Sequence, residues 1–502
     1  MSENLEKYLD ISPTADVAKL QKFKSIKEMG IDPYPRVFER DLVSSQLKEK
    51  YSGLEIGEKR EDDLCAVAGR LMLRRDMGKV FFLDIYDETG KIQIYVSAPE
   101  LSELEAKLLD KLDIGDFIGI FGFVFRTKTG EITVHCKKLT LLAKSLAAMP
   151  EKFHGLSDTD LRYRQRFIDM TMNPGVREIF KKRAFIIREI RNFLDEKGFV
   201  EFETPILQTI YGGASAEPFK THHNDLDIDV FLRISPELYL KKLIAGGFEK
   251  VYDIAKDFRN EGMDHTHSPE FTMIEWYEAY TDYFYQMKQM ENLVESIVKK
   301  MNNGGTVLKY GDYEIDYKTP WRRLTIYDGL RQYANIEPTT ISKDELISEL
   351  QRLTKNVEVR KSKGELLCEL FEETAERHLI QPTFVCDHPV EISPLTKIHR
   401  REEGLVERFE VFVGTMELAN CYTELNDPID QALRLKQQEE NREFDSEAQP
   451  MDKSFVHAVE FGMPPMSGIG IGLDRLTMAL TNTPNIRDVI AFPIMKPRPG
   501  DL

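Results

Sequence analysis

Residues 257–277, DFRNEGMDHTHSPEFTMIEWY, carry the side-chain types that bind charged ligands. An Arg-Asn-Glu cluster comes first, and the run from Phe271 to Tyr277 then alternates between two sets of residues, which predicts a strand. In such a strand Glu275 shares a face with Phe271. A buried carboxylate without a partner is strongly unfavourable, so this face is either solvated or built to hold a cation.

Three glutamates, Glu410, Glu417 and Glu424, follow one another at intervals of seven residues. Seven residues along a strand reverse its face, so these side chains can converge only if a turn or a bulge lies between them. Carboxylates suit Mg²⁺, which proteins hold with one or two carboxylates together with substrate phosphates. The alternative is a set of solvated acids on an exposed strand.

The run SGIGIGLDRLTM, residues 467–478, places Gly468, Gly470 and Gly472 on one face of a predicted strand. A flat ligand or another element could approach the backbone there. The helix predicted next carries Arg475 near its N-terminus, where anions are favoured. The spacing departs from the Rossmann fingerprint, and close helix–strand packing beside a surface arginine is the alternative.

The scaffold predicted for residues 171–502 is α+β, with a mainly antiparallel sheet flanked by helices. An amphipathic helix is predicted from Val176 to Leu194, and Gly198 follows it as a C-terminal cap. The alternating run at 199–207 predicts a strand, which Pro205 confines to a sheet edge. Strands and helices then mix without a βαβ rhythm. Residues 330–405 are predicted to be a mostly helical insertion.

The N-terminal part differs in composition. Residues 1–60 are predicted to be a helical extension, broken by Gly and Pro at 30–35. Short β-rich runs between residues 61 and 143 predict a five-stranded barrel of the oligonucleotide-binding (OB) type, with an SH3-like barrel as the alternative. Residues 144–170 are predicted to link this barrel to the C-terminal domain.

The composition limits the class of protein. The chain has 502 residues and a net charge of −17, and its sequence contains no apolar run long enough for a transmembrane helix. Neither a membrane protein nor a non-specific nucleic-acid binder is expected. Basic stretches at 69–79 and 126–138 are either a local nucleic-acid-binding face or solvated strands. Five scattered cysteines and a polar N-terminus predict a cytoplasmic protein without disulfides.

Three pairs of elements, taken in order, resemble the three signature motifs of class II aminoacyl-tRNA synthetases. They are the helix with its Pro-containing strand, the pair of strands that follows and carries the FRNE sequence, and the Gly-rich strand with its arginine. Runs such as GIDPYP, KFHGLSDTDLRYRQRFIDM and LANCYTELND are similar to the lysyl-tRNA synthetase family. The resemblance covers nearly the whole chain. It implies an anticodon-binding OB-fold and a class II catalytic domain that activates L-lysine with ATP and Mg²⁺, then charges tRNA(Lys). The family is generally a homodimer.

The resemblance also implies roles for individual residues. Arg259 would be catalytic, contacting the α-phosphate and the lysine carboxylate where charge develops. ATP would be bound by Arg259, Glu261, His267, Phe271, Glu410, Glu417 and Arg475, with Glu410 and Glu417 as Mg²⁺ ligands. Lysine would be bound by Gly213, Glu237, Arg259, Glu275, Tyr277, Asn420 and Glu424. Anticodon bases would contact Arg75, Phe82, Gln93 and Glu131.

Within the implied lysine site, Glu275, Glu424 and the Tyr277 hydroxyl would surround the ε-ammonium. An aspartyl- or asparaginyl-tRNA synthetase of the same subclass is a rival, but this pair of glutamates would repel aspartate. Another rival, a relative that lysylates a protein, would usually lack the barrel. A non-enzymatic nucleic-acid-binding paralogue would not need intact ATP-binding residues. Glu217 stands where the family usually has Arg or Lys, which predicts a changed surface contact.

Overall fold

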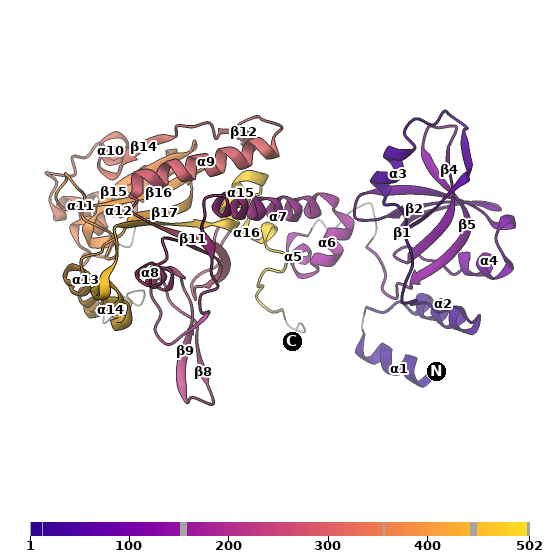
Figure 1. Cartoon of the computed structure of the whole chain (residues 1–502). Coiled ribbons are helices and arrows are strands. Elements are labelled where there is room, and N and C mark those ends of the chain that lie inside the picture. The colour runs from indigo at the N-terminus through magenta and orange to yellow at the C-terminus, as the bar shows by residue number, and fades with distance from the viewer. Residues whose placement is uncertain (1, 13, 151–157, 355–356, 442–448, 499–502) are drawn as a thin grey trace. The chain divides into compact units, whose positions relative to one another are not determined.

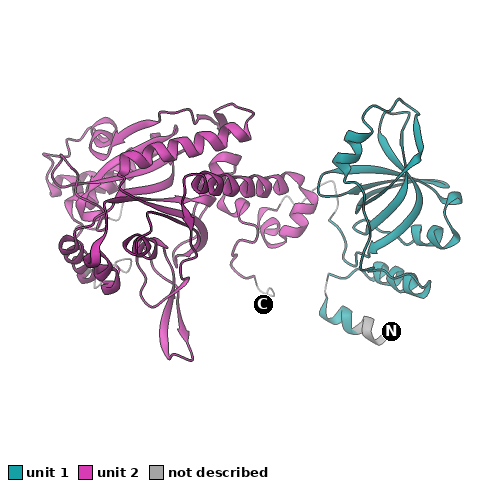
Figure 2. Ribbon diagram, viewed as in Figure 1, with its two compact units in different colours: residues 1–155 teal, residues 156–502 magenta. Residues whose placement is uncertain are grey.

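Figure 1 shows a computed structural model of the chain, which describes all residues except 1, 13, 151–157, 355–356, 442–448 and 499–502. The described residues fall into two compact units, Met1–Gly155 and Leu156–Leu502 (Figure 2). Within those ranges, no helix is long and apolar enough to cross a membrane. In the predicted linker, residues 151–157 lie outside the described ranges, while α5 (Thr159–Arg164) and α6 (Arg166–Met172) are helical.

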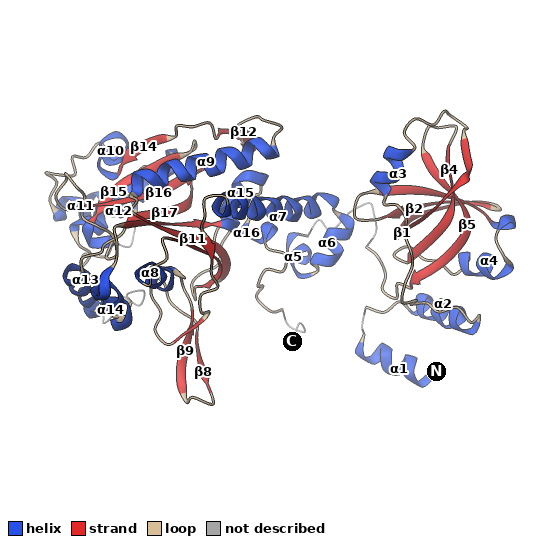
Figure 3. Ribbon diagram, in the orientation of Figure 1, coloured by secondary structure: helices blue, strands red, loops and turns tan. Residues whose placement is uncertain are grey.

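In the described part of the first unit, five strands close into a barrel in the order β1-β2-β3-β5-β4, as predicted (Figure 3). The strands are β1 (Lys59–Met77), β2 (Val80–Tyr86), β3 (Lys91–Ser97), β4 (Phe117–Arg126) and β5 (Ile132–Ala143). The helical elements are α1 (Ser2–Ile11), α2 (Val17–Glu28), α3 (Ser44–Lys50), η1 (Ala98–Glu100) and α4 (Glu103–Leu109). Alternate residues such as Phe81, Leu83 and Ile85 fill the barrel.

The second unit is built on a sheet with eight strands among the described residues, ordered β14-β15-β16-β17-β18-β11-β10-β6. The strands are β6 (Val200–Glu201), β10 (Lys250–Phe258), β11 (Glu270–Ala279), β14 (Arg322–Thr325), β15 (Thr383–Pro389), β16 (Leu405–Val413), β17 (Met416–Thr423) and β18 (Met466–Gly472). All neighbours are antiparallel except the edge pairs β6–β10 and β14–β15. This confirms the predicted α+β fold.

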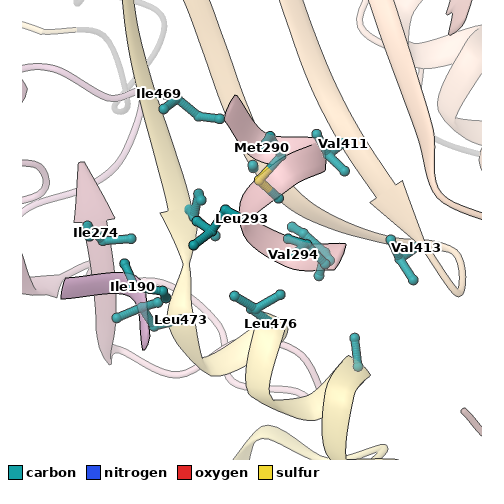
Figure 4. Packing of buried hydrophobic residues seen from close by; sticks show 14 of the residues in the cluster. Ile190, Ile274, Met290, Leu293, Val294, Val411, Val413, Ile469, Leu473 and Leu476 are labelled. Carbon is teal, nitrogen blue, oxygen red and sulfur yellow. The ribbon is translucent and has the colours of Figure 1, made fainter. Parts of the chain in front are cut away.

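Helices pack against one face of this sheet. α7 (Pro174–Asp195), α9 (Tyr283–Met301) and α15 (Leu473–Thr481) enclose a core with Ile274 of β11 and Val411 of β16 (Figure 4). Because side chains alternate along a strand, Ile274 faces this core and Glu275 faces the opposite side. The core therefore holds the strands in place from behind the face that carries Glu275.

The other elements of the second unit surround the sheet. The strands β7 (Leu207–Gln208), β8 (Lys220–His223) and β9 (Ile228–Leu232) form a small separate sheet, which projects downward in Figure 1. A hairpin is formed by β12 (Val307–Tyr310) and β13 (Tyr313–Asp316). The helical elements are α8 (Glu237–Ala245), α10 (Ile326–Gly329), η2 (Leu330–Ala334), α11 (Lys343–Leu353), α12 (Lys363–Thr374), η3 (Glu376–His378), η4 (Val390–Ile392), α13 (Pro428–Asn441), α14 (Lys453–Gly462) and α16 (Ile486–Val489).

Two predicted segments differ in the structure. The strand expected at 199–207 is reduced to β6 and the first residue of β7, because Pro205 between them has no N–H to donate to a ladder. β6 nevertheless lies at an edge of the sheet, as expected. The segment 330–405 is helical in its first part, but it also contains β15, whose apolar residues are buried within the sheet. A buried strand of this kind lacks the period-two pattern of a half-exposed strand.

Candidate active site

A cavity of about 400 Å³ lies on the sheet face that carries Glu275. It is lined by the predicted residues Gly213, Glu237, Arg259, Glu261, His267, Phe271, Glu275, Tyr277, Glu410, Glu417, Asn420 and Arg475. Residues from three distant segments of the chain therefore meet in one place. Glu424 is the exception, because it lies behind the cavity wall and is 1% exposed.

The glycine-rich strand β18 makes room for the side chains of β11. Gly468 is paired with Tyr277, and Gly470 is paired with Glu275. A Cβ on Gly468 would lie 2.1 Å from Tyr277 Cε1 and 2.7 Å from Glu424 Oε1, and a Cβ on Gly470 would lie 2.5 Å from Met273 Cε. The glycines are thus required by neighbouring side chains that form the wall of the cavity.

Glu275 is buried and held by two hydroxyl groups. Ser235 Oγ donates to Glu275 Oε1 at 2.8 Å, and the Tyr277 hydroxyl donates to Oε2 at 2.9 Å. Burial, followed by the negative charge of Glu237, raises the pKa of Glu275, whereas both hydroxyl groups favour the charged form. A cation in the cavity would favour ionisation of this carboxylate further.

Lys241 of α8 was not anticipated from the sequence and lies beside the predicted lysine-binding residues. Its Nζ is 2.5 Å from Glu237 Oε1 and forms a second ion pair with Glu424 Oε2. Burial alone would lower the pKa of Lys241, but the charges of Glu237 and Glu424 outweigh it and raise the pKa. This lysine is therefore an ammonium ion inside the protein.

The other end of the cavity is rich in cationic donors. The Arg259 guanidinium lies 5.1 Å from the centre of the Phe271 ring, and its buried Nε has no hydrogen-bond partner in the described part of the chain. Arg475 Nη2 is 2.8 Å from His267 Nε2, and its Nη1 is 3.3 Å from Glu417 Oε2. Guanidinium groups with unused donors suit a phosphate or a carboxylate.

Glu410 and Glu417 reach the cavity because the hairpin between them is irregular. Gly414 and Thr415 both have positive φ at its turn, and the register shifts by one residue after Val411. The sequence predicted a turn or a bulge between these glutamates, and the structure contains both.

Arg408 orients the glutamate on β16. Its Nη2 donates to Glu410 Oε1 at 2.6 Å, and its Nε donates to Asn420 Oδ1 at 3.2 Å. Burial and then the negative charge of Glu410 raise the pKa of Glu417. No group of three or more His, Cys, Asp or Glu suited to a metal ion is found among the described residues. Two carboxylates fit Mg²⁺ when ligand oxygens complete its coordination.

The loop that carries Gly213 is held from two sides. Gly213 N–H donates to Gln449 Oε1 at 2.8 Å, and Gln449 Nε2 donates to Ala214 O at 2.5 Å. On the other side, Asn260 N–H donates to Glu217 O at 2.8 Å. The Glu217 side chain is exposed, which agrees with a changed surface contact and leaves the backbone link intact.

The predicted anticodon residues share the outer face of the barrel. Arg75 is paired with Phe82, and Phe82 with Tyr95, across β1, β2 and β3. The rings of Phe82 and Tyr95 are in edge contact at 5.5 Å. Gln93, two residues before Tyr95, accepts a hydrogen bond from Thr133 at 3.0 Å, and Glu131 lies 3.5 Å from Lys91 in the same row. The face thus combines aromatic rings with polar groups.

Comparisons with known proteins agree with this geometry. Residues 158–496 match the family model "tRNA synthetases class II (D, K and N)", and residues 65–142 match "OB-fold nucleic acid binding domain". The chain is 52% identical to the lysine–tRNA ligase of Clostridium acetobutylicum over 487 residues, covering 96% of this chain and 93% of the relative. It is 47% identical to the lysine–tRNA ligase of Syntrophomonas wolfei over 498 residues, covering 99% of each.

The chain belongs to the class II lysyl-tRNA synthetase family. The OB-fold match decides against the SH3-like alternative for the barrel. Within this synthetase fold, Lys241, Arg408 and Gln449 were missed because each also contacts a residue on another element, namely Glu424, Asn420 and Gly213. Two local signals existed: the spacing of four between Glu237 and Lys241, which is typical of an ion pair along a helix, and the spacing of two between Arg408 and Glu410.

Proposed function

We propose that this chain is a lysine–tRNA ligase. It activates L-lysine with ATP to give lysyl-adenylate and pyrophosphate, and then transfers the lysyl group to the 3′ end of tRNA(Lys). The observation that carries the proposal is a cavity with buried carboxylates at one end and unused guanidinium donors at the other. Family membership supports the same reaction.

The amino-acid end suits lysine because it holds cations. Glu275, Glu424 and the Tyr277 hydroxyl receive the ε-ammonium, and Glu237 with the Gly213 carbonyl receives the α-ammonium. An ammonium group has three donors and needs acceptors on several sides. Neutral or shorter amino acids would leave buried carboxylates unpaired, which supplies the selectivity.

The reaction needs positioning and charge stabilisation, and no side-chain nucleophile. The lysine carboxylate attacks the α-phosphate and pyrophosphate leaves. Arg259 holds both reacting groups with its two-pronged guanidinium, and Asn420 orients the carboxylate. Phe271 and Arg475 enclose the adenine, Glu261 accepts from its amino group, and His267 lies beside the phosphates.

Glu410 and Glu417 are the residues that would hold Mg²⁺. Bound there, Mg²⁺ would neutralise charge on the phosphate oxygens as pyrophosphate leaves. Burial, and then the negative charge of Glu410, raises the pKa of Glu417, so a bound cation would favour its ionised form. Arg408 fixes the orientation of Glu410 for this task.

The barrel face binds the anticodon arm of the tRNA. Phe82 stacks on a base, and Arg75, Gln93 and Glu131 contact base edges.

We further propose that the protein is a homodimer, which is supported by the exposed side chains of Val200, Ile206 and Leu207 around the edge strand β6. We also propose a reducing cytoplasm as its compartment, which is supported by five cysteines without disulfide partners. Light scattering measures the dimer directly.

The decisive experiment is amino-acid-dependent ATP–pyrophosphate exchange with lysine, aspartate and asparagine. The proposal expects exchange with lysine and none above background with the other two. Charging of tRNA(Lys) transcripts with labelled lysine tests the second step. Exchange with aspartate or asparagine would favour the sibling synthetases, and no exchange with any amino acid would favour a non-enzymatic paralogue.

A further inference from the structure

The amino-acid end of the cavity contains more negative charge than lysine can neutralise. Glu237 and Glu275 line this end and Glu424 lies directly behind its wall; all three are buried, and lysine carries two ammonium groups. The substrate carboxylate is matched separately by Arg259 at the other end of the cavity. A third buried carboxylate would therefore stay unpaired in the complex, at a high cost in free energy.

Lys241 supplies the missing positive charge from within the protein. Its side chain is almost fully buried, and its Nζ bridges Glu237 Oε1 and Glu424 Oε2. The rings of Tyr277 and Tyr422 lie near it, at 5.8 and 6.0 Å from Nζ. These aromatic and acidic neighbours keep the ammonium in one place.

The ion pairs occupy one oxygen of each glutamate and leave the other for a ligand. No well-aligned hydrogen bond to Glu424 Oε1 is formed by any residue that the structure describes. Burial raises the pKa of this carboxyl to about 8, whereas the charge of Lys241 and then the Gly468 N–H favour its ionised form. Gly468 itself lines the cavity. A Cβ on Gly468 would lie 2.7 Å from Glu424 Oε1, so only this glycine, which has no side chain, separates the free oxygen from the cavity.

We propose that Lys241 is a specificity-determining positioning residue, which neutralises one of the three glutamates and turns Glu237 and Glu424 so that each keeps one oxygen for one ammonium group of the substrate. The inference rests on the proposed function, because it assumes that lysine is the amino acid bound. Lys241 does not touch the reacting atoms. It sets the charge of the site to two negative units, which selects an amino acid with two ammonium groups.

The test is Lys241→Met, which keeps the volume of the side chain and removes its charge. In lysine-dependent pyrophosphate exchange, the KM for lysine should rise roughly 10- to 100-fold, with the KM for ATP nearly unchanged. The matched control is Lys242→Met. The neighbouring Lys242 also forms an ion pair, but at 2.8 Å from Asp452 Oδ2 and not with Glu237 or Glu424, so its removal should leave lysine binding unchanged.

A pH profile separates this role from a purely structural one. Among the described residues, the ionisable groups that face Lys241 are Glu237 of α8, Tyr277 of β11, Tyr422 of β17 and Glu424, which directly follows β17. Losing an opposite charge at this range raises a carboxyl pKa by roughly 1–3 units. The lysine KM of Lys241→Met should therefore reach its low plateau at a higher pH than that of the unchanged protein.

A second variant keeps the test valid if Lys241→Met does not fold. Lys241→Met combined with Glu424→Gln removes both charges of one ion pair. Because Lys241 acts through Glu424 as well as Glu237, Lys241→Met should raise the lysine KM by a smaller factor in the Glu424→Gln background than in the unchanged protein. An equal or larger factor in that background would overturn the proposal, as would an unchanged or lower lysine KM in folded Lys241→Met. If the unchanged protein shows no lysine-dependent exchange, the proposed function itself fails.

Discussion

Gly468 and Tyr277 are direct neighbours on β18 and β11, and the tyrosine ring fills the space where a Cβ of residue 468 would be. The separation would be 2.1 Å from that Cβ to Tyr277 Cε1, well inside van der Waals contact. The position of the Tyr277 hydroxyl, which donates to Glu275, therefore depends on the absence of a side chain across the strand.

Gly468→Ala should displace Tyr277 and weaken lysine binding more than it weakens ATP binding. Overpacking of this kind costs about 1–3 kcal/mol, which corresponds to roughly a 5- to 150-fold rise in the lysine KM. Pyrophosphate exchange at varied lysine and varied ATP measures both. Gly472→Ala is the comparison, because the nearest atom outside its own stretch of backbone, Leu418 O, would lie 3.8 Å from its Cβ, in ordinary van der Waals contact. Equal effects of the two substitutions would contradict the steric explanation.

Arg259→Lys should lower the rate of pyrophosphate exchange by about a hundredfold or more, because a point charge cannot replace a guanidinium that holds two groups at once. The buried Nε of Arg259, which no described residue accepts from, is ready for such a ligand. Single-turnover measurements of adenylate formation separate this effect from product release. Near-normal rates would remove Arg259 from the chemical step.

Phe82→Ala should lower the efficiency of tRNA charging by roughly 5- to 150-fold, since stacking of a base on an aromatic ring contributes about 1–3 kcal/mol. Lysine-dependent pyrophosphate exchange should not change, because it requires no tRNA. Phe81→Ala is the control on the same strand. Phe81 is 8% exposed and packs in the barrel core, so its loss should cost about 3–5 kcal/mol of stability and lower the melting temperature. If Phe81→Ala lowered tRNA charging and Phe82→Ala lowered the melting temperature, the RNA-binding face would be the one that carries Phe81, and the prediction would be wrong.

Asp257→Asn should stabilise the protein increasingly as the pH rises from 5 to 7. Asp257 is fully buried near Arg233, and burial raises its pKa to about 7. In the unfolded chain this carboxyl ionises near pH 4, so the folded protein binds the extra proton and loses stability as the pH rises through this window. Asparagine does not titrate, so its advantage should grow by roughly 2–3 kcal/mol between pH 5 and 7, then level off. Melting curves at pH 5, 7 and 8 check this, and a constant difference would contradict it.

The sequence predicted the parts of the site that depend on local pattern. The alternation from Phe271 to Glu275 was sufficient to place both side chains on one face, and the structure puts both in the cavity wall. Phe81 and Phe82 are adjacent in the sequence, so alternation alone places them on opposite faces of β2, and Phe81 lies in the core. Strand alternation is a strictly local property, so it can be derived without knowledge of the sheet.

Long-range partners could not be derived in the same way. The pairing of Lys241 with Glu424 joins α8 to the residue that follows β17, and nothing near either residue in the sequence indicates it. The short strand at 199–207 was overestimated for a related reason, because an alternating run forms a ladder only where a neighbouring strand is available. β15 was overlooked because its burial is set by strands that flank it in the sheet.

In the irregular hairpin of β16 and β17, the number of residues between the two glutamates is itself a requirement for activity. Glu410 and Glu417 face the same cavity because a turn at Gly414 and Thr415 and a one-residue register shift compensate for their odd spacing. Deleting or inserting a single residue there would rotate one glutamate to the opposite face, with every ligand-binding side chain still encoded. A protein with such an insertion or deletion would be inactive. A sequence alignment with its relatives would nevertheless show every ligand-binding residue to be present.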